Sequence, residues 1–169
     1  MQKFGIDISR YQKGFDFDKA KAEGVEFAIL RGAYHLSKDK SFEDFYAACK
    51  TRNIPVGGYL YSMAKTVAGG KEEAQLIIDN VLKDKQFEYP IYMDVEDKVQ
   101  RELGKTKLTE IVIAFCETLK AAGYYVGIYA STGFFKSYLI DSKLTAYEKW
   151  VAQWAKKCQY GGEYGLWQF

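Results

Sequence analysis

The chain has 169 residues, with 24 Lys and Arg against 22 Asp and Glu, a formal net charge of +2. This length predicts one domain, and the even charge balance excludes a protein that binds nucleic acid through a basic stripe. The sequence contains no apolar run of the roughly 18 residues that a membrane span needs. A strand-like segment follows Met1 directly, so we expect neither membrane insertion nor a secretory signal.

Cysteine and histidine content narrows the chemistry further. Three cysteines without C-x-x-C spacing argue against a disulfide framework or a zinc site. Cys49 and Cys116 fall on apolar helical faces, which predicts small buried hydrophobic residues rather than reactive thiols. His35 is the only histidine, which excludes a histidine-rich metal centre. We expect His35 to be a surface or hydrogen-bonded residue.

Strands and helices alternate along most of the chain. Alternating β-branched and aromatic residues predict strands at 4–9, 25–32, 55–62, 89–96, 124–131, 149–154 and 165–169. Apolar residues at helical spacing predict helices at 42–49, 74–81 and 108–119, with a shorter helical stretch at 133–140. Gly24, Asn53 and Gly123 lie where helices should end, and Ser41 and Asp44 have the spacing of a capping box.

The order of these elements predicts the fold class. Strands separated by helices favour right-handed parallel crossovers, and therefore a parallel sheet or a β/α barrel. Only residues 155–164 separate the last two strands, which is too few for a crossover helix, so these strands should pair directly. We expect a single barrel-like α/β domain over residues 1–169 whose final part contains strands alone.

The strand at 89–96 carries the most informative chemistry. Alternation places Ile91, Met93 and Val95 on one face, toward the helices, and Asp94 and Glu96 on the other. The two carboxyl groups then point into the mouth of a barrel from the carboxyl end of a strand, where barrel enzymes keep their active sites. Burial beside a second carboxylate raises a pKa, so we expect Glu96 to be a general acid and Asp94 to stay ionised. The alternative is a solvated acidic strand end.

The first strand repeats this pattern, with Asp7 facing inward between Ile6 and Ile8. An acid there is costly to bury unless it is paired or functional, so Asp7 is either a hydrogen-bonded structural residue or part of the site. We expect Arg31 to be the buried ion-pair partner of one of the acids. Aromatic residues make up 17% of the chain. They gather near other strand ends, which is consistent either with an aromatic core or with a groove that stacks on sugars.

Six segments resemble glycoside hydrolase family 25, the Chalaropsis-type lysozymes of phage endolysins and bacterial autolysins. They read GIDIS at 5–9, PVGGYLY at 55–61, PIYMDVE at 90–96, GIYAS at 127–131, WVAQW at 150–154 and LWQF at 166–169. These segments occur in order over essentially the whole chain. The resemblance implies a flattened (β/α)5(β)3 TIM-like barrel.

The resemblance also implies a function and roles for particular residues. The enzyme would be an N-acetylmuramidase that cleaves the β-1,4 bond between N-acetylmuramic acid and N-acetylglucosamine in peptidoglycan, without metal or cofactor. Glu96 would be the general acid and base, Asp94 would orient the 2-acetamido group, and Asp7 would complete the acidic floor. Retention through attack by the acetamido oxygen is implied. The groove-lining positions of the family are Tyr61, Tyr129, Gln153 and Trp154.

The chain departs from the family pattern at its end. Family members continue past the Trp-Gln-aromatic strand into one more strand with an acidic residue, whereas this chain stops at Phe169. We therefore expect a barrel whose last strand is missing, an open edge that invites oligomerisation, and no wall-binding module. We also expect synthesis in the bacterial cytoplasm without a signal peptide and action on the cell wall after release.

Two other functions stay open at this point. The first is a truncated module that binds peptidoglycan with weak or no catalysis. The second is a metal-dependent hydrolase in which Asp7, Asp94, Glu96 and Asp97 hold Mg²⁺ or Ca²⁺ through carboxylate oxygens.

Overall fold

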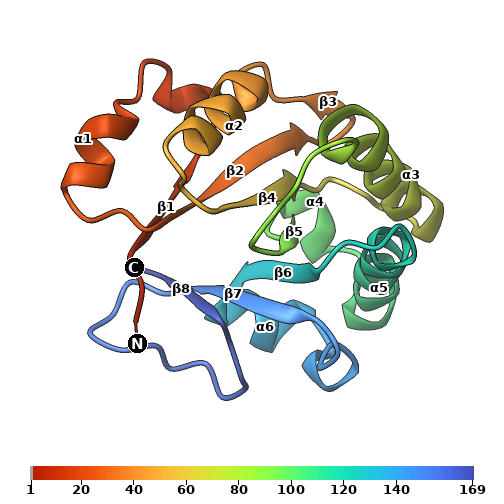
Figure 1. Ribbon diagram of the computed structural model, residues 1–169. Helices are drawn as coiled ribbons and strands as arrows, with labels where there is room; N and C mark the ends of the chain where they lie inside the picture. The colour runs from red at the N-terminus through yellow and green to blue at the C-terminus, as the bar shows by residue number, and fades with distance from the viewer. Residues whose placement is uncertain (1) are drawn as a thin grey trace.

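Seven parallel strands form a curled sheet in a computed structural model that describes residues 2–169 (Figure 1). In sheet order they are β1 (Gly5–Ile8), β2 (Phe27–Tyr34), β4 (Val56–Tyr61), β5 (Ile91–Asp94), β6 (Val126–Ser131), β7 (Glu148–Ala152) and β8 (Leu166–Gln168). All seven strands that the sequence predicts are confirmed. A two-residue strand that the sequence does not reveal, β3 (Ser37–Lys38), pairs antiparallel with the end of β2.

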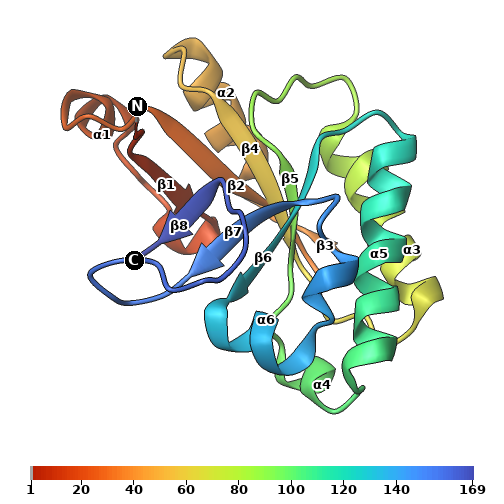
Figure 2. The same cartoon turned by 90° about the horizontal axis from the view of Figure 1, so that it is seen from below.

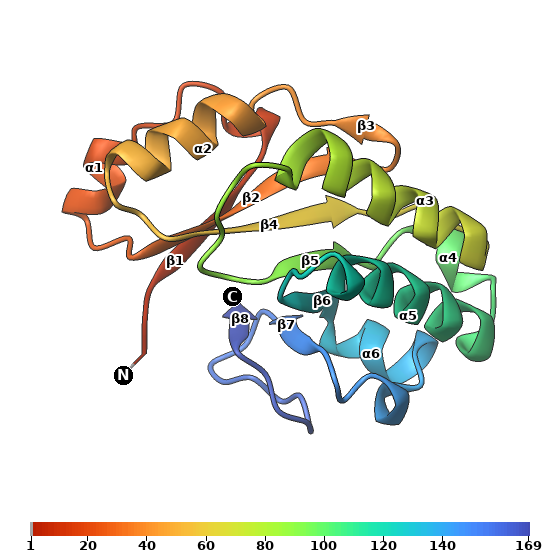
Figure 3. The same cartoon turned by 45° about the vertical axis from the view of Figure 1, so that its right-hand side comes forward.

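Helices connect the strands and cover the outer face of the sheet. They are α1 (Phe17–Ala22), α2 (Phe42–Thr51), α3 (Val67–Ile77), α4 (Lys98–Arg101), α5 (Lys105–Ala121) and α6 (Thr132–Tyr138). Short helical turns add η1 (Arg10–Gln12), η2 (Ile78–Leu82) and η3 (Asp141–Lys143). Figure 3 shows α3 and α5 lying side by side along one flank, with α1 and α2 on the other. The helices predicted from apolar spacing are confirmed.

The helix ends confirm one expectation and correct another. Gly24, Asn53 and Gly123 have φ values of 95°, 54° and 89°, the left-handed backbone typical of helix C-termini. The capping box at the start of α2 is wrong, because the Ser41 side chain makes no capping hydrogen bond. The Oδ1 atom of Asp39 instead accepts a hydrogen bond from the Ser41 backbone N–H at 2.9 Å. Asp39, which is buried, therefore holds the turn before α2.

The two faces of the sheet carry different side chains. The outer face packs aliphatic residues against the helices, among them Ile8, Leu30, Leu60, Met93 and Ile128. Buried aromatic side chains dominate the inner face, where Tyr92 and Trp150 pack with Phe27 and Ile29. The predicted alternation of strand 89–96 is confirmed, since Ile91, Met93 and Val95 all lie in the outer core. The inner face is therefore the side that can hold a site.

The last two strands leave the sheet open. β8 pairs with β7 in parallel and without an intervening helix, as the short connection predicts. Within residues 2–169 the sheet runs from β1 to β8 without backbone pairing between these two strands. Figures 1 and 2 nevertheless show β8 lying beside β1. The architecture is thus the expected flattened TIM-like barrel with a closing strand missing. No helix among the described residues is both long and apolar enough to cross a bilayer.

Candidate active site

Asp94 occupies the centre of the barrel mouth. It is the last residue of β5, and its register partners are Tyr61 on β4 and Tyr129 on β6. The negative charges of Glu96 and Asp7 both raise the pKa of Asp94, so both carboxyl groups lie within electrostatic range of Asp94. The structure therefore brings together the three acids that the sequence singles out.

The environment of Asp94 favours its protonated form. The residue is only 5% exposed, and burial is the largest cause that raises its pKa well above the ordinary value of 3.8, followed by repulsion from Glu96 and Asp7. Arg31 opposes this shift. Within residues 2–169, Asp94 Oδ1 is buried and has no hydrogen-bond partner. An ionised Asp94, as the sequence predicts, does not agree with this setting, because strand alternation does not reveal how deep the carboxyl lies.

Glu96 lies two residues beyond Asp94, in the loop before α4, and is half-buried. Desolvation raises its pKa, Arg101 lowers it, and Asp97 raises it. Asp97 fixes this loop because its Oδ1 accepts from Val99 N at 2.8 Å and its Oδ2 accepts from the Tyr61 hydroxyl at 3.0 Å. A raised pKa and partial exposure suit a group that exchanges a proton with a bound molecule.

Asp7 is joined to the far side of the barrel through Gln168. The Gln168 amide nitrogen donates to Asp7 Oδ2 at 2.8 Å, and its oxygen accepts from the Tyr129 hydroxyl at 2.7 Å. This relay links β1, β8 and β6 across the open seam. Desolvation raises the pKa of Asp7, and the Gln168 hydrogen bond lowers it. Sequence reasoning missed Gln168 as a site residue, although it lies in the LWQF segment.

Aromatic rings form the walls around the acids. The Tyr129 ring centroid lies 4.5 Å from that of Trp150, and Tyr59 meets Trp150 edge-on at 5.9 Å. The Tyr61 ring stacks on Tyr34 at 4.8 Å. Burial is the largest cause that raises the pKa of Tyr129, and the charges of Glu96 and Asp94 add to it. Tyr129 therefore lies within electrostatic range of the acids, and Tyr61 is linked to their loop through Asp97.

The other two predicted groove residues lie on the loop between β7 and β8. The side-chain amide of Gln153 is engaged within this loop, donating to Gln159 Oε1 at 2.9 Å and accepting from Gln159 N at 2.7 Å. Trp154 is 88% exposed. Such a ring offers a flat apolar face to a ligand at the surface.

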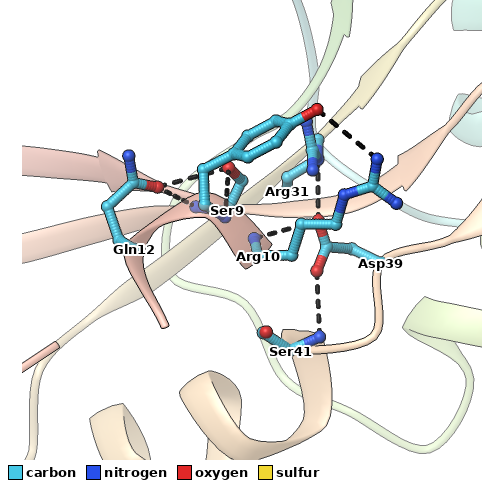
Figure 4. A network of polar contacts seen from close by, with 7 residues as sticks. Ser9, Arg10, Gln12, Arg31, Asp39 and Ser41 are labelled. Atoms are coloured by element: carbon cyan, nitrogen blue, oxygen red, sulfur yellow. Dashed lines mark hydrogen bonds and ion pairs between the residues drawn. The ribbon is translucent and has the colours of Figure 1, made fainter. Parts of the chain in front are cut away.

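Arg31 is an ion-pair partner, but not of the three inward acids (Figure 4). Its Nε donates to Asp39 Oδ2 at 2.7 Å, and both side chains are buried. Asp39 Oδ2 also accepts from Arg10 N at 3.2 Å, which ties the end of β1 to the start of α2. Asp39 was absent from the predicted partners because it lies in a polar loop. Within the described chain, Arg31 Nη2 is buried without a partner, and its charge reaches Asp94.

The remaining reactive residues are structural. His35 Nδ1 lies 2.6 Å from Glu73 Oε1, so His35 is the hydrogen-bonded residue that the sequence predicts. Burial raises the pKa of Cys49 to about 12 and also raises that of Cys116, which confirms both as inert core residues. Among residues 2–169, no group of three or more His, Cys, Asp or Glu side chains is arranged to hold a metal ion.

Comparison with solved structures identifies the same architecture in other proteins. The chain superimposes on the CTP1L endolysin with a TM-score of 0.88 and 22% identity, covering 100% of this chain and 60% of that one. A family 25 glycosyl hydrolase from Bacillus anthracis gives a TM-score of 0.85 and 23% identity, covering 99% of this chain and 79% of that one. At such low identity these likenesses establish the fold.

Sequence comparison identifies the family to which the chain belongs. A curated relative, the autolytic lysozyme of Clostridium acetobutylicum, is 26% identical over 151 residues, which are 89% of this chain and 44% of the relative. The chain therefore spans less than half the length of that relative. The sequence pattern described as Glycosyl hydrolases family 25 matches residues 6–169, a range that includes all three acids of the barrel mouth. With fold, acidic mouth and sequence pattern in agreement, this chain belongs to glycosyl hydrolase family 25.

Proposed function

We propose that this chain is a muramidase that cleaves the β-1,4 bond between N-acetylmuramic acid and N-acetylglucosamine in peptidoglycan. The observation that carries the proposal is that buried Asp94, at the carboxyl end of a parallel strand, is within electrostatic range of Asp7 and Glu96. Asp94 is buried, Glu96 is half-buried and Asp7 is exposed. Carboxyl groups that range from buried to accessible, beside aromatic walls, suit a neutral, flat-faced sugar that reacts by proton transfer. Membership of a glycosyl hydrolase family and the likeness to an autolytic lysozyme support the same chemistry.

Glu96 is the proposed general acid and base. It is half-buried and able to approach a ligand, and its raised pKa keeps a proton available. Glu96 gives this proton to the glycosidic oxygen while the 2-acetamido oxygen of the sugar attacks C1 and the glycosidic bond breaks. Glu96 then takes a proton from the water that opens the cyclic intermediate. The two inversions at C1 give a product with retained configuration.

Asp94 is the proposed partner of the acetamido group. Its Oδ1 has no partner among the described residues, so it can accept the acetamido N–H. A hydrogen bond to the charged form lowers a carboxyl pKa. Substrate binding therefore favours an ionised Asp94, while Glu96 keeps the proton that it donates. Asp7, held by Gln168, completes the floor and adds negative charge near the developing positive charge at C1.

Four residues are proposed to hold the glycan chain. Tyr61 donates to Asp97, next to Glu96, and Tyr129 donates to Gln168, which holds Asp7. Trp154 supplies an exposed ring for stacking. Gln153 acts by holding the loop that carries Trp154, since its amide is bonded to Gln159.

The setting of the chain is also a proposal. We propose that residues 1–169 act as the catalytic domain, without a wall-binding module of their own, and that the protein is made in the bacterial cytoplasm and acts on the wall after release. Among residues 2–169, β8 pairs only with β7, and such an edge favours association with a second copy. Light scattering over a range of protein concentrations tests this association, and a constant monomer mass would reject it.

The function is tested by measuring new reducing ends released from purified Gram-positive peptidoglycan. We expect Glu96→Gln to lower the rate by about 100-fold or more, since general acid catalysis contributes about 10²–10⁴-fold. Glu102→Gln is the matched control, because Glu102 is exposed on the same segment. Equal rates for all three proteins would remove Glu96 from the mechanism. Binding to the wall without release by any of them would instead support the binding-module alternative.

A further inference from the structure

A surface groove of about 800 Å³ lies between the segment after β1 and helix α2, outside the acid site. Its inner end adjoins the barrel mouth, because Arg10 and Tyr11 follow β1 and Arg10 N donates to Asp39. Its outer end reaches Arg52, the residue that ends α2. At ~1.5 Å per helical residue, the groove runs roughly 16 Å along α2 from Ser41 to Arg52.

The groove carries exposed charged side chains of both signs. Arg10, Lys13 and Lys40 line it, are exposed, and form no ion pair with a carboxylate among residues 2–169. Asp16 and Asp44 line the same groove and are also exposed. The acid site differs, because carboxyl groups crowd there and disfavour a further anion. The groove therefore suits a ligand with carboxylates and an ammonium group.

Tyr11 marks the junction between the groove and the barrel mouth. Its side chain is 72% exposed, yet its ring is held by two cations, with Arg10 Cζ at 5.2 Å and Arg31 Cζ at 5.0 Å from the ring centroid. Cation–π contacts of this kind fix an exposed ring in place. The ring is thus a preformed surface where a ligand can pass from the acid site into the groove.

We propose that this groove binds the stem peptide of peptidoglycan, which is attached to the lactyl group of muramic acid. The inference rests on the proposed function and extends it to the part of the substrate that is not cleaved. A stem peptide has free carboxylates and, at its diamino acid, an amino group, which complement the exposed positive and negative side chains of the groove. Five extended residues span roughly 16–18 Å, close to the length of the groove. A polyanion such as teichoic acid fits less well, since Asp16 and Asp44 would repel it.

The test measures binding of labelled glycan strands by fluorescence anisotropy. Uncross-linked strands free of teichoic acid are compared with and without their stem peptides, in a Glu96→Gln background so that the strands stay intact. We expect Lys13→Glu with Lys40→Glu to weaken binding of peptide-bearing strands about tenfold, or about 1.4 kcal/mol. Binding of peptide-free strands should not change.

The matched control is Lys71→Glu with Lys107→Glu, which makes the same change in net charge at exposed positions on α3 and α5. Thermal melting shows whether each double variant is folded. Equal weakening on both kinds of strand, or no weakening on either, overturns the stem-peptide proposal. A parallel measurement uses strands that retain teichoic acid, and weakening on those strands alone assigns the groove to that polymer and overturns the stem-peptide proposal. Cleavage of peptide-free strands by the unmodified protein reports separately on the proposed function.

Discussion

The outer and inner faces of the curled sheet are built from the same strands but do different work. On β5, Met93 points outward into the aliphatic core, and its neighbour Asp94 points inward to the barrel mouth. The outer face is sealed by helices, whereas the inner face leaves a buried carboxylate oxygen unpartnered within the described chain. Met93 thus contributes to stability and its neighbour Asp94 to the proposed chemistry, so single substitutions can test the two roles separately.

The largest expected effect is on the outer face. Met93→Ala removes a fully buried side chain from the main core, which should lower the free energy of unfolding by about 2–5 kcal/mol. Activity per folded molecule should stay unchanged because Met93 does not face the site. Urea unfolding and an assay at low temperature measure the two quantities. A selective loss of activity would show that the faces are not independent.

The next largest effect is a loss of activity at Asp94, the neighbour of Met93 on β5. Asp94→Asn should lower the cleavage rate about 100-fold, or about 2.7 kcal/mol, the scale of losing one charge contact to the transition state. The assay is release of reducing ends from peptidoglycan, with the fold checked by circular dichroism. Retention of full activity would exclude the proposed contact between Asp94 and the acetamido group.

The same variant makes a prediction about stability. Because folding raises the pKa of Asp94 above its ordinary value of 3.8, the folded protein binds this proton more tightly than the unfolded chain. Ionising Asp94 therefore lowers the stability of the folded protein. This loss of stability is absent below pH 3.8 and grows as the pH rises through the folded pKa. Asp94→Asn should therefore melt at a higher temperature than the unmodified protein at neutral pH, with the difference shrinking in acid. A constant difference across pH would contradict the raised pKa.

A smaller effect is expected at Gln168, where β8 lies beside β1. Gln168→Leu removes the hydrogen bonds to Asp7 and Tyr129, which should destabilise the fold by about 1–2 kcal/mol. It should also raise the pKa of Asp7 further, because the Gln168 hydrogen bond lowers it. Carboxyl carbon NMR titration follows Asp7, and Gln86→Leu at an exposed position is the control. An unchanged Asp7 titration would show that the relay has no electrostatic role.

The smallest effect is a change in substrate affinity at Trp154, an exposed aromatic residue. Trp154→Ala should raise KM about threefold to tenfold, since stacking on one aromatic ring contributes about 0.5–1.5 kcal/mol. Its melting temperature and kcat should not change, because the side chain is 88% exposed. Steady-state kinetics on soluble glycan fragments measure this. An unaltered KM would remove Trp154 from glycan binding.

The elements of the fold follow from local sequence patterns. Strand alternation identifies which side chains of β1 and β5 face inward, and Asn53 and Gly123 locate helix ends through their left-handed backbone. The error at Ser41 arises because two nearby residues compete to hold the same turn, and Asp39 is chosen since it also binds Arg31. Local spacing cannot show this second partner.

The sequence predicts the acids of the candidate site but not the hydrogen bonds and charges around them. Asp7, Asp94 and Glu96 lie at strand ends, which parallel topology brings together. Gln168 was missed because its role depends on β8 lying beside β1, a contact between residues 161 positions apart. The raised pKa of Asp94 was likewise hidden, since it depends on burial and on charges from other segments.

The central claim is that the interior acids cut the glycan on the reducing side of muramic acid. Its most direct test is borohydride reduction of the products formed by the unmodified protein and by Glu96→Gln, followed by mass spectrometry of the reduced sugars. We predict that new ends are muramitol and that Glu96→Gln forms almost none. New ends that are glucosaminitol, or muramitol formed equally by both proteins, would contradict the claim.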